Sequence, residues 1–395
     1  MDKSVNVDYT YKNNVCENLR VWMIKPTNTQ NMKRSYVKPD QINILPTGEK
    51  LAYFELEKGQ SLHMNFDVNE YIVDKERVLS KEDRFLYLRN TVLSPINDQI
   101  KKLALDITKN EEIDKEKAFS LFYYVVNNFK YVYPPKDRGA TSFLKSKQGD
   151  CGEYSFLFTS LCRSIGIPAR SVTGGWAYGK MNGHMWNEIF IKKEGWIPVD
   201  CSMAYLQKKK IFRFLFSNLS TLSWKKYFGQ TEGQRIVFSK DTETELIPKY
   251  KDNDDKVFYN TDIMYINSNP FYWGQQSLNG KAPYLQPVYI ELNSNSNNYR
   301  RKLVTLDILG EWKVREKGTR RLLLLLKNIT FTLGLTTFLI NLIQQNIYTE
   351  FLNTISFMTF ALCFIFRKER VLLFSIIFIF MLLSLLSTLH PYTIG

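Results

Sequence analysis

Few side chains in this sequence could carry covalent chemistry, and one of them has an unusual setting. The 395 residues include five cysteines and three histidines. Cys151 lies in the stretch QGDCGEY, flanked closely by Gly149 and Gly152 and followed by an apolar helical pattern. A cysteine in such a place is a packing residue, a metal ligand, half of a disulfide or a nucleophile.

The residues after Cys151 predict a buried helix that begins at the cysteine itself. Apolar side chains recur at helical spacing and form one stripe: Tyr154, Leu157, Phe158, Leu161, Cys162 and Ile165. Gly166 and Pro168 predict its end, and Asp150 is a candidate N-cap. The free N–H groups and the dipole at a helix N-terminus favour a thiolate. We therefore expect a lowered pKa for Cys151, whose own N–H could form half of an oxyanion hole.

A cysteine nucleophile needs a general base, and His184 is the best placed histidine. His184 opens the alternating strand GHMWNEIFI, which leads through the turn KKEG to a second strand, GWIPVD, ending at Asp200. In one hairpin register Ile191 faces Trp196, and Asp200 then points to the other face of the sheet. With the register shifted by one residue, Asp200 faces Trp186 and shares the face of His184. A Cys–His–Asp triad requires this second register.

Four motifs occur in a fixed order: GDCGE, LCRSIGIPARSVTG, HMWNE and GWIPVD. In this order and spacing they resemble the core of the transglutaminase-like superfamily, over roughly residues 85–205. The resemblance implies that Cys151 is the nucleophile, His184 the general base and acid, and Asp200 the residue that orients and charges the imidazole. It also implies an α+β, papain-like fold, in which a helix bearing the cysteine packs on an antiparallel sheet bearing the histidine and the aspartate.

The second oxyanion donor is not marked by a motif. Tyr131, Tyr133 and Gln148, upstream of the cysteine, are the candidates. Asn187 and Glu188 either shape the site or pack within the hairpin.

A zinc site is the rival chemistry, formed by Cys151, His184, Asp200 and Cys201. Asp200 and Cys201 are expected to be adjacent on a strand, so their side chains diverge and cannot bind one ion, and Cys201 is expected to pack. No EF-hand loop or carboxylate cluster indicates calcium. We therefore expect no metal and no cofactor. The scattered, odd number of cysteines also predicts a reducing compartment without disulfides.

The chain divides into four expected regions. Residues 1–80 form a β-rich N-terminal domain, 81–228 the transglutaminase-like core, 229–312 a β-rich C-terminal extension, and 313–395 a membrane region. Ser94, Pro95 and Asp98 predict the start of a helix in the core. The last predicted strand of the extension is LVTLDIL.

Three apolar runs near the C-terminus are expected to span a membrane: 322–343, 347–366 and 371–389. Basic sequences, KVREKGTRR and RKER, precede the first run and separate the second from the third, whereas the loop QQNIYTE has no Lys or Arg. Basic loops stay in the cytoplasm. The N-terminal sequence also lacks an apolar signal region. The expectation is an integral cell membrane protein whose catalytic region faces the cytoplasm.

The formal charge of +14 raises the question of a polyanionic partner. No nucleic-acid-binding signature occurs, so no nucleic acid is expected. The charge suits an anionic membrane surface, or serves general solubility. Residues 207–227, which mix lysines with Phe and Trp, are either a membrane-surface segment or a solvated connecting helix.

These observations favour a membrane-anchored thiol enzyme that acts on the amide bonds of a peptide or protein through an acyl-thioester, with hydrolysis favoured over cross-linking. The alternative is a catalytically inactive, membrane-linked peptide-binding module, because the superfamily includes members that have lost activity.

Overall fold

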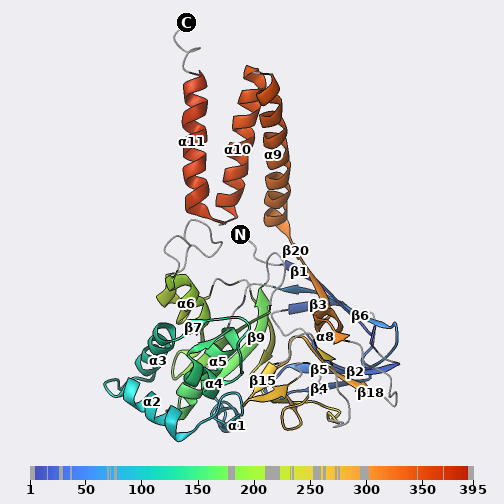
Figure 1. Cartoon of the computed structure of the whole chain (residues 1–395), viewed down its shortest axis with the longest axis vertical. Coiled ribbons are helices and arrows are strands. Elements are labelled where there is room, and N and C mark those ends of the chain that lie inside the picture. Colours follow the sequence, from blue (N-terminus) through green and yellow to red (C-terminus); the bar gives the residue numbers. More distant parts are fainter. Residues whose placement is uncertain are drawn as a thin grey trace. The chain divides into compact units, whose positions relative to one another are not determined.

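The computed structural model describes residues 5–15, 17–25, 30–35, 38–68, 71, 73–74, 78–176, 183–209, 223–231, 233, 235–251, 259–260, 264–271, 274, 276–293, 302–344, 346–367 and 369–389. The chain forms two compact units, one of which joins Ser4–Leu206 to Ser223–Arg315, while the other contains Glu316–Gly395 (Figure 1). Cys16, His390 and residues 210–222 of the basic aromatic segment lie outside the described residues.

Two four-stranded sheets face each other across an apolar core in the larger unit. The first has the strand order β20-β1-β6-β3 and the second β18-β2-β5-β4. Their bounds are β1 (Val5–Lys12), β2 (Asn18–Ile24), β3 (Gln30–Ser35), β4 (Gln41–Ile44), β5 (Lys50–Glu57), β6 (Ser61–Val68), β18 (Val288–Asn293) and β20 (Glu311–Glu316). Side chains alternate between buried and half-buried along β1, as a strand with one face in a core requires. Buried residues from both sheets form one apolar cluster.

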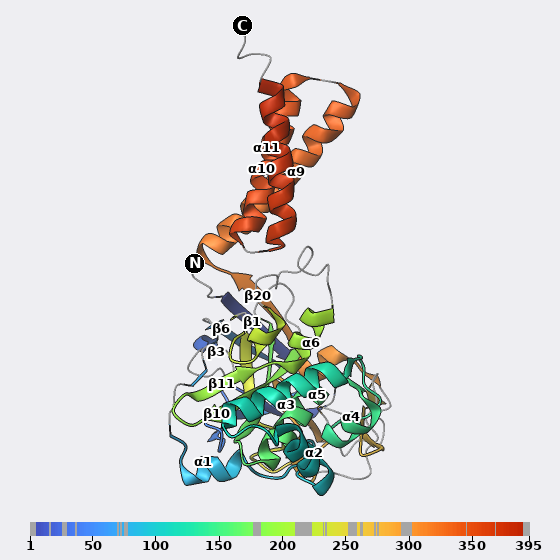
Figure 2. The same ribbon diagram turned by 90° about the vertical axis from the view of Figure 1, so that its left-hand side faces the viewer.

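The third four-stranded sheet has the order β11-β10-β9-β12 and carries the candidate chemistry. It consists of β9 (Ala169–Trp176), β10 (Gly183–Ile191), β11 (Gly195–Val199) and β12 (Arg235–Lys240), all antiparallel to their neighbours. Helix α5 (Cys151–Ser164) packs against it (Figure 2). The other helices of this unit are α1 (Lys81–Leu86), α2 (Asp98–Thr108), α3 (Asp114–Asn128), α4 (Ala140–Ser146), α6 (Cys201–Lys209), a 3₁₀ turn (Trp224–Tyr227) and α8 (Thr305–Leu309).

Short strand pairs complete the larger unit. They are β7 (Lys130–Tyr131) with β8 (Gln148–Gly149), β13 (Thr244–Glu245) with β17 (Lys281–Ala282), β14 (Tyr259–Asn260) with β19 (Lys302–Leu303), and β15 (Met264–Ile266) with β16 (Asn269–Phe271). The α+β class expected for the chain is confirmed, with the cysteine helix packed on an antiparallel sheet.

The β-rich regions expected before and after the core are joined in one architecture. β18 pairs with β2, and β12 pairs with β9 of the central sheet. Ile236 and Phe238 of β12 lie in the sandwich cluster, whereas Val237 packs with Trp186 on the site side. Such pairings join residues far apart in the sequence, so local patterns cannot reveal them.

Two local expectations were wrong. α2 begins at Asp98 and is capped by Asn97, whose side chain accepts from the N–H of Ile100, so the cap lies three residues after Ser94. LVTLDIL is not one strand, because its second half forms α8. The side chain of Asp307 accepts from the N–H of Val304 there and satisfies the first turn of a short helix.

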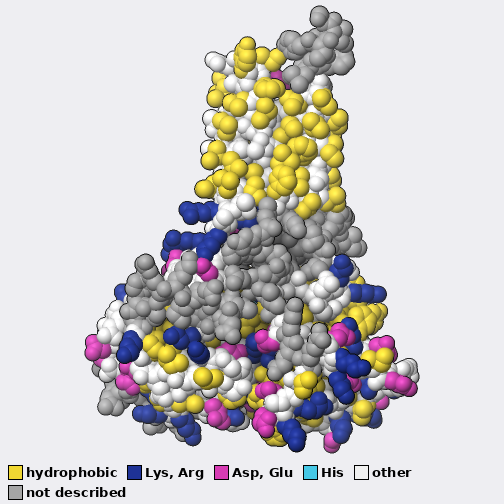
Figure 3. Space-filling view, turned by 180° about the vertical axis from the view of Figure 1, so that it is seen from behind, with side chains coloured by type: hydrophobic (Ala, Val, Ile, Leu, Met, Phe, Trp, Pro, Cys, Tyr) yellow, Lys and Arg dark blue, Asp and Glu magenta, His cyan; other side chains and the backbone are white. Residues whose placement is uncertain are grey.

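The smaller unit consists of apolar helices. α9 (Gly318–Ile343) and α10 (Ile347–Phe366) are long and apolar enough to cross a membrane. α11 (Val371–Leu389) is also apolar, although the part with described side chains, Val371–Leu386, is shorter. Large apolar side chains such as Leu342 and Phe380 are exposed on these helices, and Figure 3 shows apolar side chains over most of their visible surface.

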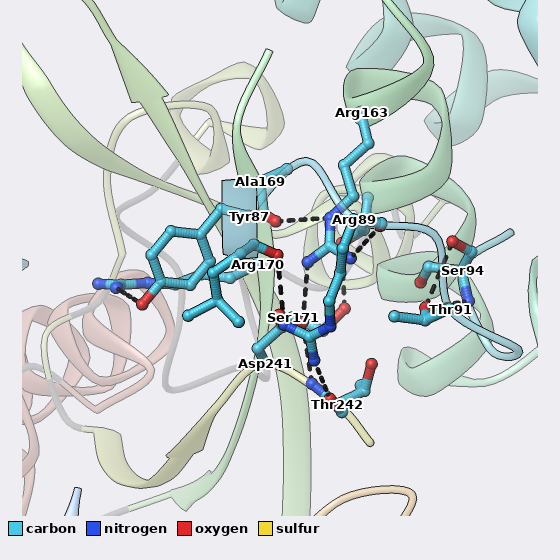
Figure 4. A network of polar contacts seen from close by, with 12 residues as sticks. Tyr87, Arg89, Thr91, Ser94, Arg163, Ala169, Arg170, Ser171, Asp241 and Thr242 are labelled. Carbon is cyan, nitrogen blue, oxygen red and sulfur yellow. Dashed lines mark hydrogen bonds and ion pairs between the residues drawn. The ribbon is translucent and has the colours of Figure 1, made fainter. Parts of the chain in front are cut away.

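A buried ion pair fixes α5 relative to the end of β12 (Figure 4). Arg163 of α5 donates to Asp241 at 2.8 Å, and the guanidinium of Arg89 donates to the other carboxylate oxygen at 2.7 Å. The N–H of Asp241 donates to the carbonyl of Ser171 in β9. The side chains of Arg163 and Asp241 are almost fully buried, so neither charge can be solvated if the other is lost.

We expect Asp241→Asn to lower the free energy of unfolding by about 3 kcal/mol, because it leaves Arg163 buried without its carboxylate. Lys115→Ala breaks an exposed pair with Glu194 and is expected to cost less than about 1 kcal/mol. Denaturant unfolding of the detergent-solubilised chain measures both. Equal losses in the two variants would contradict the importance assigned to Asp241.

Candidate active site

Cys151 is the first residue of α5, as expected from the sequence. Asp150 caps the helix, since its side chain accepts from the N–H of Gly152 at 2.8 Å. Glu153 completes a capping box by accepting from the N–H of Asp150 at 3.1 Å. The guanidinium of Arg138 lies within 3.3 Å of oxygens of both carboxylates. The start of the helix, and therefore the cysteine, is held by this buried group.

The pKa of Cys151 differs from the expectation. Burial raises the pKa of the thiol, and the neighbouring Asp150 carboxylate raises it further, while a backbone hydrogen bond with Met185 and the charge of Arg138 act in the opposite direction. The expected lowering by the helix N-terminus was therefore wrong for the resting protein. The physical reason is first that burial disfavours the charged thiolate, and second that the carboxylate of Asp150, which caps the helix, repels it.

The hairpin adopts the register that a triad requires. Asn187 pairs with Val199 and Ile191 with Gly195, which places Asp200 beside Trp186 and on the face of His184. His184 Nε2 lies 2.7 Å from Asp200 Oδ2, and both side chains are buried. The sequence left two registers open, and the tertiary structure selects the second.

Asp200 receives donors from three further groups. Its Oδ1 accepts from the Ser202 hydroxyl and from the Met203 N–H, both at 2.9 Å, so Asp200 also caps α6. Its Oδ2 lies 2.8 Å from a guanidinium nitrogen of Arg235. Burial by itself raises the pKa of this carboxyl, but His184 and Arg235 outweigh burial and hold the pKa well below its usual range.

The His184 ring lies between two indoles. Its centroid is 4.5 Å from that of Trp176 and 6.0 Å from that of Trp186, with nearly parallel planes. The indole N–H of Trp186 donates to the hydroxyl of Tyr71, which fixes that ring. A ring stacked in this way has little freedom to rotate, so its Nε2 stays directed at the carboxylate.

Met185, the residue that follows His184 in β10, makes a backbone hydrogen bond with Cys151, so the strand of the histidine contacts the start of α5. Among the described residues, no hydrogen bond links the Cys151 sulfur to the imidazole. The contact between a catalytic thiol and its base is often long without substrate and tightens when substrate binds.

Asn187 holds the strand of His184 against the helix of Cys151. Its Nδ2 donates to Ser155 O at 2.9 Å, and it lies 3.0 Å from Ser155 Oγ and 2.8 Å from Thr159 Oγ1. Asn187 follows His184 by three residues in β10, and Ser155 follows Cys151 by four residues, about one helical turn, in α5. Asn187 therefore acts in the packing of the site, one of the two roles left open for it. Glu188 pairs with Arg170 and also packs within the hairpin face.

The three oxyanion candidates lie in different environments. Tyr131 is half-buried and burial raises its pKa, and it pairs across β7 and β8 with Gly149, two residues before Cys151. Gln148 is exposed on β8, and the Tyr133 side chain is 74% exposed. Of the three, Tyr131 is the one whose side chain is partly buried.

Two arginines were missed from the sequence, Arg138 and Arg235. Arg235 is buried and Arg138 nearly so, and both contact carboxylates of the site. Both lie outside the four motifs. The only available signal was an arginine at the start of the apolar strand sequence RIVFSK.

No group of three or more potential metal ligands occurs among the described residues. The residues of the zinc alternative do not fit an ion in their geometry, because the Asp200 oxygens are occupied by protein donors and Cys201 is buried at the start of α6. The expected divergence of Asp200 and Cys201 along one strand was wrong, since the strand ends at Val199.

Comparison with known proteins finds similarity in the part of the chain that contains Cys151, His184 and Asp200. Residues 101–201 match the family model described as the transglutaminase-like superfamily. A mouse peptide-N(4)-(N-acetyl-beta-glucosaminyl)asparagine amidase is 23% identical over 184 residues, covering 45% of this chain and 25% of that protein. YebA of Bacillus subtilis, described as uncharacterized, is 26% identical over 146 residues, covering 31% of this chain and 19% of that protein.

The solved structure of red sea bream transglutaminase aligns with a TM-score of 0.28 at 12% identity, covering 61% of this chain and 59% of that one. The chain thus spans a quarter or less of the length of the two curated relatives named here.

We expect Asn187→Ala to lower the free energy of unfolding by about 2 kcal/mol, because it removes the hydrogen bonds that join β10 to α5. Ser160→Ala is the matched control, since Ser160 lies on α5 but donates to the carbonyl of Pro95, away from β10. Denaturant unfolding compares them, and a smaller loss for Asn187→Ala than for Ser160→Ala would contradict this role.

The lowered pKa of Asp200 predicts a dependence of stability on acid pH. The ionised carboxylate stabilises the folded state above about pH 4, the usual pKa of an aspartate. This contribution is lost as the pH falls toward the lower folded-state pKa. Unfolding measured from neutral to acid pH should therefore show a steeper loss in the wild type than in Asp200→Asn. Parallel curves would show that Asp200 is not the group responsible.

Proposed function

Since the chain carries a core of the transglutaminase-like superfamily, we propose that it is a membrane-anchored thiol enzyme that cleaves amide bonds through an acyl-thioester. The observation that carries the proposal is the buried 2.7 Å contact between His184 and Asp200, on the strand that contacts Cys151. The proposed roles are those of a nucleophile for Cys151, a general base and acid for His184, and an orienting carboxylate for Asp200.

The reaction proceeds in two balanced halves. His184 takes the thiol proton as the Cys151 sulfur attacks the substrate carbonyl, and the negative charge passes to the carbonyl oxygen. The C–N bond then breaks, His184 gives its proton to the leaving amine, and an acyl-thioester remains. Water attacks the thioester with His184 again as base, which releases the acid and restores the thiol.

The raised pKa of Cys151 shapes the first step. A thiol that stays protonated in the resting site is deprotonated only when His184 accepts its proton. Asp200 is held ionised by its lowered pKa, so it can stabilise the imidazolium that this transfer produces. The N–H of Cys151 and the nearby phenol of Tyr131 are the proposed donors to the oxyanion.

Hydrolysis is proposed over cross-linking, and a peptide or protein is the proposed substrate. The amidase named among the relatives acts, by its name, on an amide bond of a glycosylated asparagine. That relative supports amide chemistry at a superfamily site of this kind.

Membrane anchoring is proposed from the apolar helices α9 and α10, with α11 as a third span. Their exposed apolar side chains suit lipid. The basic residues before α9 and between α10 and α11 support a cytoplasmic catalytic region. The alternative function is a membrane-linked module that binds peptides without catalysing a reaction.

We expect an electrophilic peptide-amide probe to label the wild type and to leave Cys151→Ala unlabelled, because the probe needs the thiol. Labelling of His184→Gln should fall by a factor of about 100 or more, since the base is lost. Mass spectrometry of the labelled chain measures both.

Cys162→Ala is the control, because Cys162 is buried in the same helix and should not affect labelling beyond any loss of folded protein. Persistent labelling of Cys151→Ala would refute the proposed nucleophile. Peptide binding by a wild type that neither reacts with the probe nor releases product would favour the binding module.

A further inference from the structure

Arg235 contacts the same carboxylate oxygen as His184. A guanidinium nitrogen lies 2.8 Å from Asp200 Oδ2, the atom that also faces His184 Nε2 at 2.7 Å. The side chains of Arg235 and Asp200 are 0% and 1% exposed. The Oδ2 atom of Asp200 therefore contacts both the imidazole and the guanidinium, and the buried side chains leave no access for water.

Arg235 also contacts the two rings that flank His184. Its guanidinium carbon lies 4.9 Å from the centroid of Trp176 and 4.8 Å from that of Trp186. A planar guanidinium can donate hydrogen bonds in its plane and stack on indole faces at the same time, which an ammonium cannot do. Arg235 is thus in contact with three of the groups that surround the imidazole.

The backbone places Arg235 firmly. It begins β12, which pairs with β9 so that Arg235 lies opposite Trp176. β12 ends at Lys240, and the next residue, Asp241, is held by Arg163 of the cysteine helix (Figure 4). Gly174 permits the close approach of β12 to Trp186, because a Cβ on it would lie 1.9 Å from the carbonyl oxygen of Ile236.

We propose that Arg235 is a positioning residue of the active site, which shares the Asp200 carboxylate with His184, fixes the flanking tryptophans and, as a permanent cation beside the shared oxygen, opposes protonation of the imidazole. The part of this inference that concerns catalysis rests on the proposed function. Arg235 lies outside residues 101–201, so the site is completed by a strand that the family match does not contain.

The electrostatic part follows from the charges around the imidazole. Asp200 favours the protonated ring, and Arg235, a permanent cation beside the same oxygen, disfavours it. The other titratable neighbours of Asp200 are Tyr131 from β7 and Cys201 from α6, and burial raises the pKa of both, so they stay neutral at neutral pH. Cys151 from α5 also has a raised pKa. Removing Arg235 should therefore make His184 easier to protonate.

A purely structural role for Arg235 gives a different expectation. Loss of packing would lower stability and activity without moving the titration of the histidine in a fixed direction. The titration of His184 is thus the readout that separates the two roles.

The test is a titration of His184 in the full chain in detergent micelles, followed by NMR on protein labelled with ¹³C at histidine Cε1. The chain has three histidines, so His63→Gln and His184→Gln assign the signals. Relative to the wild type, Arg235→Met and Arg235→Gln should raise the titration midpoint of His184 by about one pH unit, because a like charge has been removed. Arg235→Lys keeps the charge and should stay close to the wild type.

Arg20→Met is the matched control. Arg20 is also buried, pairs with Glu291 and stacks over Trp22 and Tyr53, but it lies in the β-sandwich. It should leave the His184 midpoint unchanged. Thermal unfolding of each variant identifies those that are folded and therefore suitable for titration.

A wild-type midpoint in both neutral variants of Arg235 would overturn the proposal. A midpoint that shifts equally in Arg20→Met would also overturn it, since the effect would then not be local. The titration does not require turnover, so it remains decisive if probe labelling at Cys151 fails and the proposed function is rejected. If labelling succeeds, the acid limb of its pH profile should move upward with the His184 midpoint.

Discussion

The Asp200 carboxylate is the point on which the geometry of the site depends. Its two oxygens contact a histidine of β10, an arginine of β12, and a hydroxyl and an N–H of α6. A buried carboxylate is costly unless its oxygens are satisfied. The requirement to satisfy it brings three separate elements to the same place and fixes their relative positions.

A second set of buried polar contacts holds the cysteine helix against this arrangement. Arg138 joins the two carboxylates of the capping box at the start of α5, and Asn187 joins its second turn to β10. Arg163 joins its last turn to the residue after β12. The helix is therefore fixed at its beginning, middle and end by polar groups that are buried or nearly buried. Displacing any of them would leave a buried group without its partner.

These contacts also explain the chemistry available to Cys151. Burial, and then the Asp150 carboxylate that caps α5, raise the pKa of the thiol, so the helix N-terminus does not by itself produce a thiolate. The proposed deprotonation of Cys151 therefore relies on His184, whose ring contacts the same carboxylate as Arg235. The contacts that stabilise the start of α5 therefore make the proposed deprotonation of Cys151 depend more strongly on the pair formed by His184 and Asp200.

The sequence by itself determined the cysteine helix, its Asp150 cap, the hairpin with His184 and Asp200, and the α+β class. These features depend on local patterns, namely the helical repeat, strand alternation and turn residues. It did not determine the hairpin register, the cap of α2 or the helix at Thr305–Leu309, where alternatives of similar local energy exist. The pairing of β18 with β2, and Arg235 with its contact to Asp200, arise from residues far apart in the chain. Only the tertiary structure decided these, because a buried charge finds its partner through packing rather than through sequence spacing.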